Sequence, residues 1–317
     1  MNKNQPIDLG NRIHLIDGFD LGLPERTGTY VIQEDELTIV ETGPSMSIPY
    51  VLEGLKTLQL DPRDVRYIIV THIHLDHSGG AGLLLKDCPN ATVVVHPRGA
   101  RHLIDPTRLI KGARAVYGDD FDKLFEPIVP IPEEKVIIKE DGETLAIGSD
   151  CTLRFYNTPG HSDHHFSIYD PVSNGMFTGD TIGIKYDQLS DQRFNLYLPT
   201  TSPNQFKPDA MLHSLERIKD MNVERIYFGH FGVSTDVDDV YQQVKEWIPR
   251  FVAAGEKATE EGRDYHAIAE DLLAMITDHL KEKHVPDNHP IFEILKLDTE
   301  ICAMGIADYL AKRQKQA

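Results

Sequence analysis

The chain has 317 residues and a formal net charge of −18, from 32 Lys and Arg residues against 50 Asp and Glu residues. So acidic a surface repels nucleic-acid phosphates, which argues against a nuclease. No stretch approaches the ~18 apolar residues of a membrane helix, and the first ten residues lack the apolar run of a secretory signal. The three cysteines are far apart and odd in number, so we expect neither a disulfide framework nor a CxxC zinc site, and a cytoplasmic location.

The first part of the chain predicts strands followed by alternating helices and strands. Short strands with turn signals are expected over residues 12–40, and an amphipathic helix begins at Ser47. Residues 66–71 (RYIIVT) form a continuous apolar run, which is typical of a strand covered on both faces. A helix at 80–88, a strand at 91–96 and helical residues from Arg98 follow.

A second series repeats this order. Strands are predicted at 142–148, 151–160, 165–170 and 174–180, then a helix at 208–221 and a strand at 224–230. Two sheets packed face to face, with helices outside, would bury these runs. The sequence therefore predicts an α/β sandwich.

From about Asp236 the pattern becomes helical only. Three helices are expected, within 236–262, 263–283 and 289–313. We predict two domains, a catalytic domain at 1–240 and a helical C-terminal extension at 241–317. The extension either completes the fold, caps the active site or forms a homodimer interface.

The stretch THIHLDH concentrates ligand-type side chains on the loop after the strand at 66–71. It holds His72, His74, Asp76 and His77. Imidazole nitrogen and carboxylate oxygen are preferred ligands of zinc and iron. On a tight loop, His72 and His74 could hold one metal ion while Asp76 and His77 hold a second.

Two metal ions need further ligands, including a carboxylate between them. Later strand ends supply candidates: His161 in TPGH, with His164 and His165 beside it, Asp180 in TGD, and His230 in GHFG. We expect structural or surface roles for the remaining histidines, including His96, His102 and His213.

The ordered set HxHxDH, TPGH, TGD and GH resembles the metallo-β-lactamase fold superfamily over roughly residues 12–235. The resemblance implies a four-layer αβ/βα sandwich with two divalent metal ions, zinc being preferred and iron or manganese the alternatives. It implies that His72, His74 and His161 bind the first ion. It also implies that Asp76, His77 and His230 bind the second ion and that Asp180 bridges the two. In the hydrolytic mechanism that we expect, Asp76 relays a proton.

Two departures from the family pattern concern residues near the ligands. Glu41 stands where the family usually has Asp, a residue that organises the metal loop. In the third motif His164 stands where the family has a glycine, and we expect it either to line the pocket or to be exposed. His165 keeps the second histidine of that motif, and we expect it behind the ligands. Tyr186 lies shortly after Asp180 and is a candidate for the substrate pocket.

Within the superfamily the chain resembles the group that includes glyoxalase-type thioesterases and acyl-homoserine lactonases. We therefore expect a hydrolase in which a metal-bound hydroxide attacks a small-molecule thioester, ester or lactone. We expect no nucleic-acid or membrane partner. The alternatives are an iron-dependent oxidoreductase of the persulfide dioxygenase kind and a phosphodiesterase or nuclease.

Overall fold

The computed structural model describes residues 5–316 and divides into two compact units. Unit 1 holds the described residues up to Asn157, together with His164–Gly179 and Val223–Thr235. Unit 2 holds Thr158–Asp163, Asp180–Asn222 and the described residues from Asp236 onward. These units interleave along the chain, whereas the predicted domains are continuous. The predicted boundary at residue 240 stays a prediction.

The first sheet of unit 1 has seven strands in sequence order among the described residues. They are β1 (Ile7–Asp8), β2 (Ile13–Asp17), β3 (Gly28–Ile32), β4 (Thr38–Val40), β5 (Tyr67–Ile69), β6 (Thr92–Val95) and β7 (Val136–Ile138). Strands β1 to β4 pair antiparallel, and β4 to β7 pair parallel. Parallel neighbours need crossover connections, which here contain the helices.

The second sheet of unit 1 has six described strands in the order β15-β14-β11-β10-β9-β8. They are β8 (Thr144–Ala146), β9 (Thr152–Asn157), β10 (Phe166–Asp170), β11 (Gly175–Gly179), β14 (Arg225–Phe228) and β15 (Val233–Ser234). Strands β11 and β14 are parallel and the other pairs are antiparallel. Because parallel strands end at the same sheet edge, the residues that follow β11 and β14 leave from one edge.

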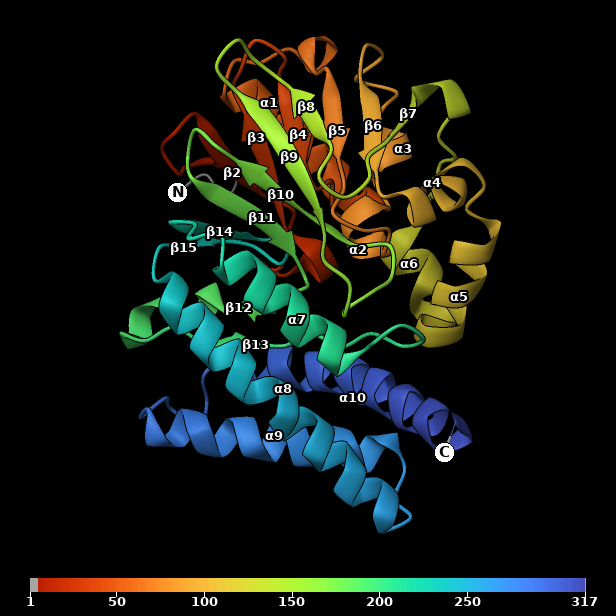
Figure 1. Cartoon of the computed structure of the whole chain (residues 1–317), viewed down its shortest axis with the longest axis vertical. Coiled ribbons are helices and arrows are strands. Elements are labelled where there is room, and N and C mark those ends of the chain that lie inside the picture. Colours follow the sequence, from red (N-terminus) through yellow and green to blue (C-terminus); the bar gives the residue numbers. More distant parts are fainter. Residues whose placement is uncertain (1–4, 317) are drawn as a thin grey trace. The chain divides into compact units, whose positions relative to one another are not determined.

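Two hydrophobic cores explain the sandwich. Alternate residues of β5 and β6 face opposite sides: Ile69 and Val94 pack between the sheets, while Ile68 and Val93 pack under the helices. The helices that pack on the first sheet are α1 (Ile48–Thr57), α3 (Ala81–Leu84) and α4 (Pro97–Ile104) (Figure 1). The short helix α2 (Leu75–Ser78) follows the loop after β5 and packs in a separate cluster. The predicted buried strand at 66–71 is confirmed over Tyr67–Ile69, where Ile68 and Ile69 are buried on opposite faces.

The pattern of residues 98–131 did not reveal two further helices, α5 (Thr107–Tyr117) and α6 (Phe121–Phe125). None of the α5 side chains is fully buried. They join a small cluster of their own, centred on Phe121, Phe125 and Leu75. Short 3₁₀ turns occur at Asp20–Gly22, Ser45–Ser47, Pro62–Asp64, Gly118–Asp120, Glu133–Lys135 and Asp187–Gln192.

Unit 2 is mainly helical. A small hairpin pairs β12 (Ile184–Lys185) with β13 (Tyr197–Leu198). The helices are α7 (Pro208–Lys219), α8 (Val237–Glu260), α9 (Tyr265–Glu282) and α10 (Ile291–Gln316) (Figure 1). The three predicted C-terminal helices are confirmed, and Pro249 lies inside α8.

The predicted α/β fold class is confirmed, with two mixed sheets, flanking helices and C-terminal helices. Within residues 5–316, every helix is too short or too polar to span a membrane.

Candidate metal centre

The loop after β5 brings the first two predicted ligands together. His72 Nε2 lies 3.0 Å from His74 Nδ1, and His72 Nδ1 lies 3.0 Å from the Thr71 hydroxyl. Two ligand nitrogens on a tetrahedral zinc ion, each at about 2.0 Å, stand about 3.3 Å apart. The pair therefore has the spacing of nitrogens that share a cation.

A second cluster of unit 1 joins the loop to the residues after β14. The donor atoms of Asp76, His77 and His230 lie within 4.8 Å of one another. Nε2 of His77 and Nε2 of His230 each lie 3.5 Å from the same Asp76 oxygen, Oδ2. His77 is almost completely buried, whereas the Asp76 side chain is 24% exposed. Solvent therefore reaches this cluster at its carboxylate.

Glu41, which follows β4, contacts the ligand loop twice. Its Oε1 accepts a 3.0 Å hydrogen bond from the Thr71 amide, and its Oε2 lies 3.3 Å from His77 Nδ1. Glu41 is 2% exposed and has a left-handed φ of 64°. A carboxylate at Nδ1 favours the tautomer with its proton there, which leaves the lone pair on Nε2. Glu41 thus contacts the loop at Thr71 and at His77, as a residue that organises the loop would.

Close packing at the sheet edge explains two glycines in the motifs. A Cβ on Gly179, the last residue of β11, would meet the Thr71 hydroxyl and lie 2.5 Å from His165 Nε2. A Cβ on Gly229 would lie 2.7 Å from the His77 ring and 3.1 Å from the Gly179 Cα. Glycine at both positions lets the two strand ends approach the imidazoles.

The two histidines predicted near the ligands line the same loop. His165 is fully buried, with its ring centroid 5.0 Å from that of His72. His164 is 7% exposed and its ring is nearly parallel to that of His72 at 6.2 Å. His164 is thus buried against the loop, which excludes the exposed alternative, while a pocket-lining role stays a prediction.

The last two predicted ligands belong to unit 2. His161 follows β9 by four residues, and Asp180 comes directly after β11. Nε2 of His161 lies 3.5 Å from Asp180 Oδ2, and its Nδ1 lies 3.1 Å from the Thr200 carbonyl oxygen. Because a carbonyl only accepts, the imidazole carries its proton on Nδ1 and its lone pair on Nε2.

Tyr186 is a candidate for the substrate pocket in the sequence. In unit 2 its side chain is 5% exposed, and its hydroxyl donates a 2.9 Å hydrogen bond to Asp298 in α10. This hydrogen bond connects the segment after Asp180 to the C-terminal helix. A role toward substrate stays a prediction.

Sequence reasoning missed Asp20, in the turn after β2. Asp20 is 4% exposed and lies within electrostatic range of Asp76 and His230. Burial raises the pKa of this carboxyl to about 6; the negative charge of Asp76 adds to the rise, while Arg26 and His230 oppose it. No local pattern signals this residue, because its neighbours in space come from distant parts of the sequence.

Histidines expected to be structural lie outside these clusters. His96 Nδ1 accepts a 3.2 Å hydrogen bond from the Arg98 amide at the start of α4, and its Nε2 lies 3.1 Å from Asn157 Oδ1. His213 is exposed on α7. His96 therefore caps the start of α4, and His213 is a surface residue.

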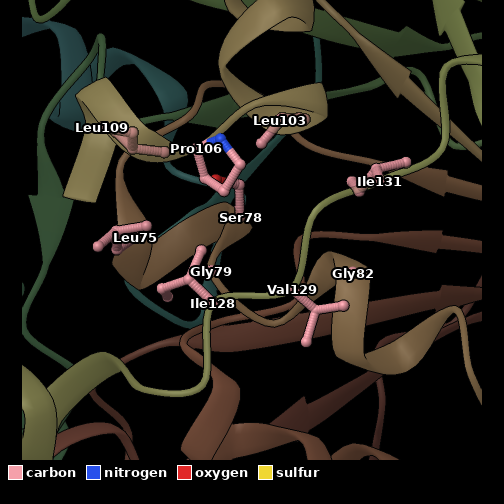
Figure 2. Close-up of a pocket in the computed structure, with 10 residues that line it drawn as sticks. All are labelled: Leu75, Ser78, Gly79, Gly82, Leu103, Pro106, Leu109, Ile128, Val129 and Ile131. Atoms are coloured by element: carbon pink, nitrogen blue, oxygen red, sulfur yellow. The ribbon is translucent and has the colours of Figure 1, made fainter.

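An apolar crevice lies beside α2, next to the ligands in sequence. Figure 2 shows Leu75, which stands between His74 and Asp76, on one side of it, with Leu109 and Pro106 nearby. Leu75 also packs with Phe121 and Phe125. The ligand loop therefore rests on the α5–α6 cluster on the side of Leu75.

The donor set fits divalent metal ions. Buried imidazoles are held by a hydroxyl, a carboxylate and a carbonyl at their other ring nitrogens, as expected for ligands of zinc or iron. Unit 1 brings His72 close to His74, and joins Asp76, His77 and His230. Unit 2 joins His161 and Asp180. The assignment of each residue as a ligand stays a prediction.

The fold and these clusters define an α/β sandwich protein with sites suited to divalent metals. The chain belongs to the metallo-beta-lactamase superfamily, whose family model matches residues 24–230.

Three relatives show the range of this family. A metallo-beta-lactamase fold-containing protein of Sulfurisphaera tokodaii, ST1585, is 29% identical over 70% of this chain and 78% of its own. Its crystal structure aligns with a TM-score of 0.60 and 25% identity, over 74% of this chain and 85% of the other. A putative diflavin flavoprotein of Nostoc is 26% identical over 74% of this chain, which spans only 37% of that protein. The N-acyl homoserine lactonase AttM of Azorhizobium caulinodans is 28% identical over 46% of this chain and 52% of its own.

Proposed function

We propose that this protein is a metal-dependent hydrolase that holds two divalent metal ions and cleaves a thioester, ester or lactone of a small molecule. The observation that carries the proposal is the series Glu41, His77, Asp76 and His230, in which successive side chains lie 3.3–3.5 Å apart. A carboxylate behind a ligand histidine is typical of metal centres, where it orients the ring.

The chain's own groups suit hydrolysis. When bound, divalent ions supply Lewis acidity and lower the pKa of water toward about 7. Glu41 and Thr71 fix the directions of His77 and His72, so these rings need no rearrangement to bind. Asp76 is the solvent-reached carboxylate of its cluster, which suits it to hold and pass on a proton.

The ligand assignments are part of the proposal. His72, His74 and His161 are assigned to the first ion, Asp76, His77 and His230 to the second, and Asp180 to the bridge, with zinc as the preferred metal. The support is the motif order in the sequence, the short distances within each unit and the family to which the chain belongs.

The substrate class rests on charge and on similarity. A net charge of −18 disfavours nucleic acid as a substrate. The similarity to a lactonase, and the resemblance to glyoxalase-type thioesterases, favour an acyl group with a good leaving group. A small acyl substrate is therefore proposed before a phosphodiester.

The test is acid release from protein loaded with zinc or manganese, on a panel of acyl-CoA thioesters, glutathione thioesters, lactones and phosphodiesters. We expect acid from one acyl class, abolished in Asp180→Ala and retained in Asp87→Ala, which changes an exposed carboxylate. Acid release from phosphodiesters alone would refute the acyl substrate. No acid release from any substrate of the panel by the metal-bound protein would refute the hydrolase.

A second candidate is an iron-dependent oxidoreductase, favoured by the similarity to a diflavin flavoprotein. The same ligand types bind iron. Oxygen consumption by the iron-loaded protein with a thiol or persulfide, without acid release from the panel, would favour this candidate over the hydrolase.

A further inference from the structure

The C-terminal helix α10 packs on a short segment of unit 2, Pro199–Asn204, which we term the strap. The Thr201 hydroxyl donates a 2.6 Å hydrogen bond to the Cys302 carbonyl. Two turns further along α10, Asp308 accepts a 3.1 Å hydrogen bond from the Asn204 amide, and the Lys312 ammonium donates a 2.6 Å hydrogen bond to the Asn204 carbonyl. The strap is thus hydrogen-bonded to α10 at Thr201 and at Asn204.

Between these bonds the helix and the strap are in backbone contact. A Cβ built on Gly305 would lie 2.8 Å from the Thr201 carbonyl carbon and 2.9 Å from the Ser202 amide nitrogen. Real Cβ atoms do not approach backbone atoms so closely, so any side chain at 305 must push the strap away from α10. Thr201 is completely buried, which leaves the strap little room to move.

The strap in turn holds a predicted metal ligand. The Thr200 carbonyl lies 3.1 Å from His161 Nδ1, and the Ser202 hydroxyl donates a 3.4 Å hydrogen bond to the His161 carbonyl. The residues on either side of Thr201 therefore set both the ring and the backbone of His161. The direction of Nε2, 3.5 Å from Asp180, follows from where the strap lies.

A further hydrogen bond joins α10 to the segment that follows Asp180. Asp298, one turn before Cys302, accepts the 2.9 Å hydrogen bond from Tyr186. The Gly183 amide donates a 3.1 Å hydrogen bond to the Asp180 carbonyl, which fixes the turn that begins this segment. Helix α10 thus contacts the surroundings of both unit 2 ligands.

We propose that α10 is a positioning element of the metal centre, in which Gly305 and Thr201 set the direction of His161 through the Thr200 carbonyl. The inference rests on the metal site of the proposed function, and goes beyond it by giving the C-terminal extension a role in metal binding. Backbone partners of ligand histidines commonly change metal affinity 10- to 100-fold when disturbed.

The test compares Gly305, in α10, with Gly255, a glycine of α8 that packs against α10. Gly305→Ala displaces the strap, although alanine is the better helix former. A Cβ on Gly255, in α8, would instead meet the α10 side chains Ile306 and Leu310, and no strap residue is among its nearest contacts. Zinc affinity is measured by chelator competition, and the visible absorption of the cobalt(II)-loaded protein reports the ligand geometry.

We expect Gly305→Ala to lose zinc affinity 10- to 100-fold and to change the cobalt spectrum. Gly255→Ala should lower the melting temperature and keep both metal readouts. Thr201→Val should act like Gly305→Ala, and Thr201→Ser should restore wild-type binding because it keeps the hydroxyl. The Thr201 pair decides the question if Gly305→Ala does not fold.

Three results would overturn the inference. Wild-type affinity and spectrum in Gly305→Ala, or in Thr201→Val, would show that the strap does not position His161. Equal losses in Gly255→Ala and Gly305→Ala would make the effect one of general packing. A wild-type protein that binds no metal would refute the proposed function as well, whereas the first two results would leave it standing.

Discussion

Glu41 shows how a single buried carboxylate can serve two ends of the ligand loop. Its carboxylate accepts a hydrogen bond from the Thr71 amide, just before the first predicted ligand, and faces His77 at the end of the motif. The longer side chain, where the family usually has Asp, therefore still reaches both ends of the loop. Its left-handed backbone is uncommon for a residue other than glycine, which indicates that the surrounding structure holds it in place.

Glu41→Gln should lower metal affinity about 10- to 100-fold, because the neutral amide orients His77 less strongly. The substitution keeps the size of the side chain, so thermal stability of the metal-free protein should change little. Chelator competition measures the affinity, with Glu134→Gln, at an exposed position, as the control. Unchanged affinity would mean that His77 is oriented without Glu41.

Asp20 should make the stability of the metal-free protein depend on pH. Its folded-state pKa is raised to about 6 from 3.8, so its stabilising contribution is complete below 3.8 and is lost as pH rises through about 6. The loss corresponds to about 3 kcal/mol at most, from 1.36 kcal/mol for each pKa unit. Asp20→Asn should remove this part of the pH dependence, as measured by urea unfolding between pH 4 and pH 8 without metal. Parallel curves for both proteins would contradict the shift.

These residues also show which parts of the site can be predicted from sequence. His72, His74, Asp76 and His77 stand within six positions, so their proximity follows from chain geometry alone. Glu41 and the later ligands were accessible through the resemblance to a family. Asp20 and Thr200 were not, because their contacts depend on the paths of distant segments. A backbone carbonyl such as that of Thr200 leaves no trace in residue identity.

Helix α3 meets the segment before β7 in backbone contact. A Cβ on Gly82 would collide with the carbonyl oxygen of Val129, whereas a Cβ on Gly112, in α5, would meet nothing within 4 Å. Helix α5 was missed because its apolar residues only border a small satellite cluster and none of them is buried. Helix α6 buries Phe121 and Phe125, but with five residues it is too short for a periodic pattern. Periodicity reports burial, and little of α5 is buried.

Gly82→Ala should destabilise the protein by about 1–3 kcal/mol, since the Val129 carbonyl must shift. Gly112→Ala should stabilise it by about 0.5–1 kcal/mol, since alanine is the better residue in an open helix position. Chemical unfolding of the two variants measures both changes. If both variants changed stability in the same direction, the packing around each glycine would not explain the sign of the change.

At the scale of the whole molecule, predicted ligands that meet only in the folded chain, such as Asp76 and His230, should couple metal binding to folding. A metal ion that binds only the native state stabilises it by about 2.7 kcal/mol at a hundred times its dissociation constant. We therefore expect zinc to raise the melting temperature and a chelator to reverse the rise. The rise should be reduced in Asp76→Ala and retained in Asp87→Ala. No response to any divalent metal would contradict the site.

The segments of the two units alternate along the chain, which limits how the protein can be truncated or fused to another protein. Residues 158–163 and 180–222 of unit 2 are each enclosed in sequence by segments of unit 1. A truncated chain that stops before Asp236 would retain these segments without the three helices that belong with them. Neither unit is one continuous stretch of sequence, so a gene fusion could not transfer either unit intact. The helical tail should therefore be inherited together with the sandwich, and a stop codon within α10 should impair metal binding rather than release a smaller active enzyme.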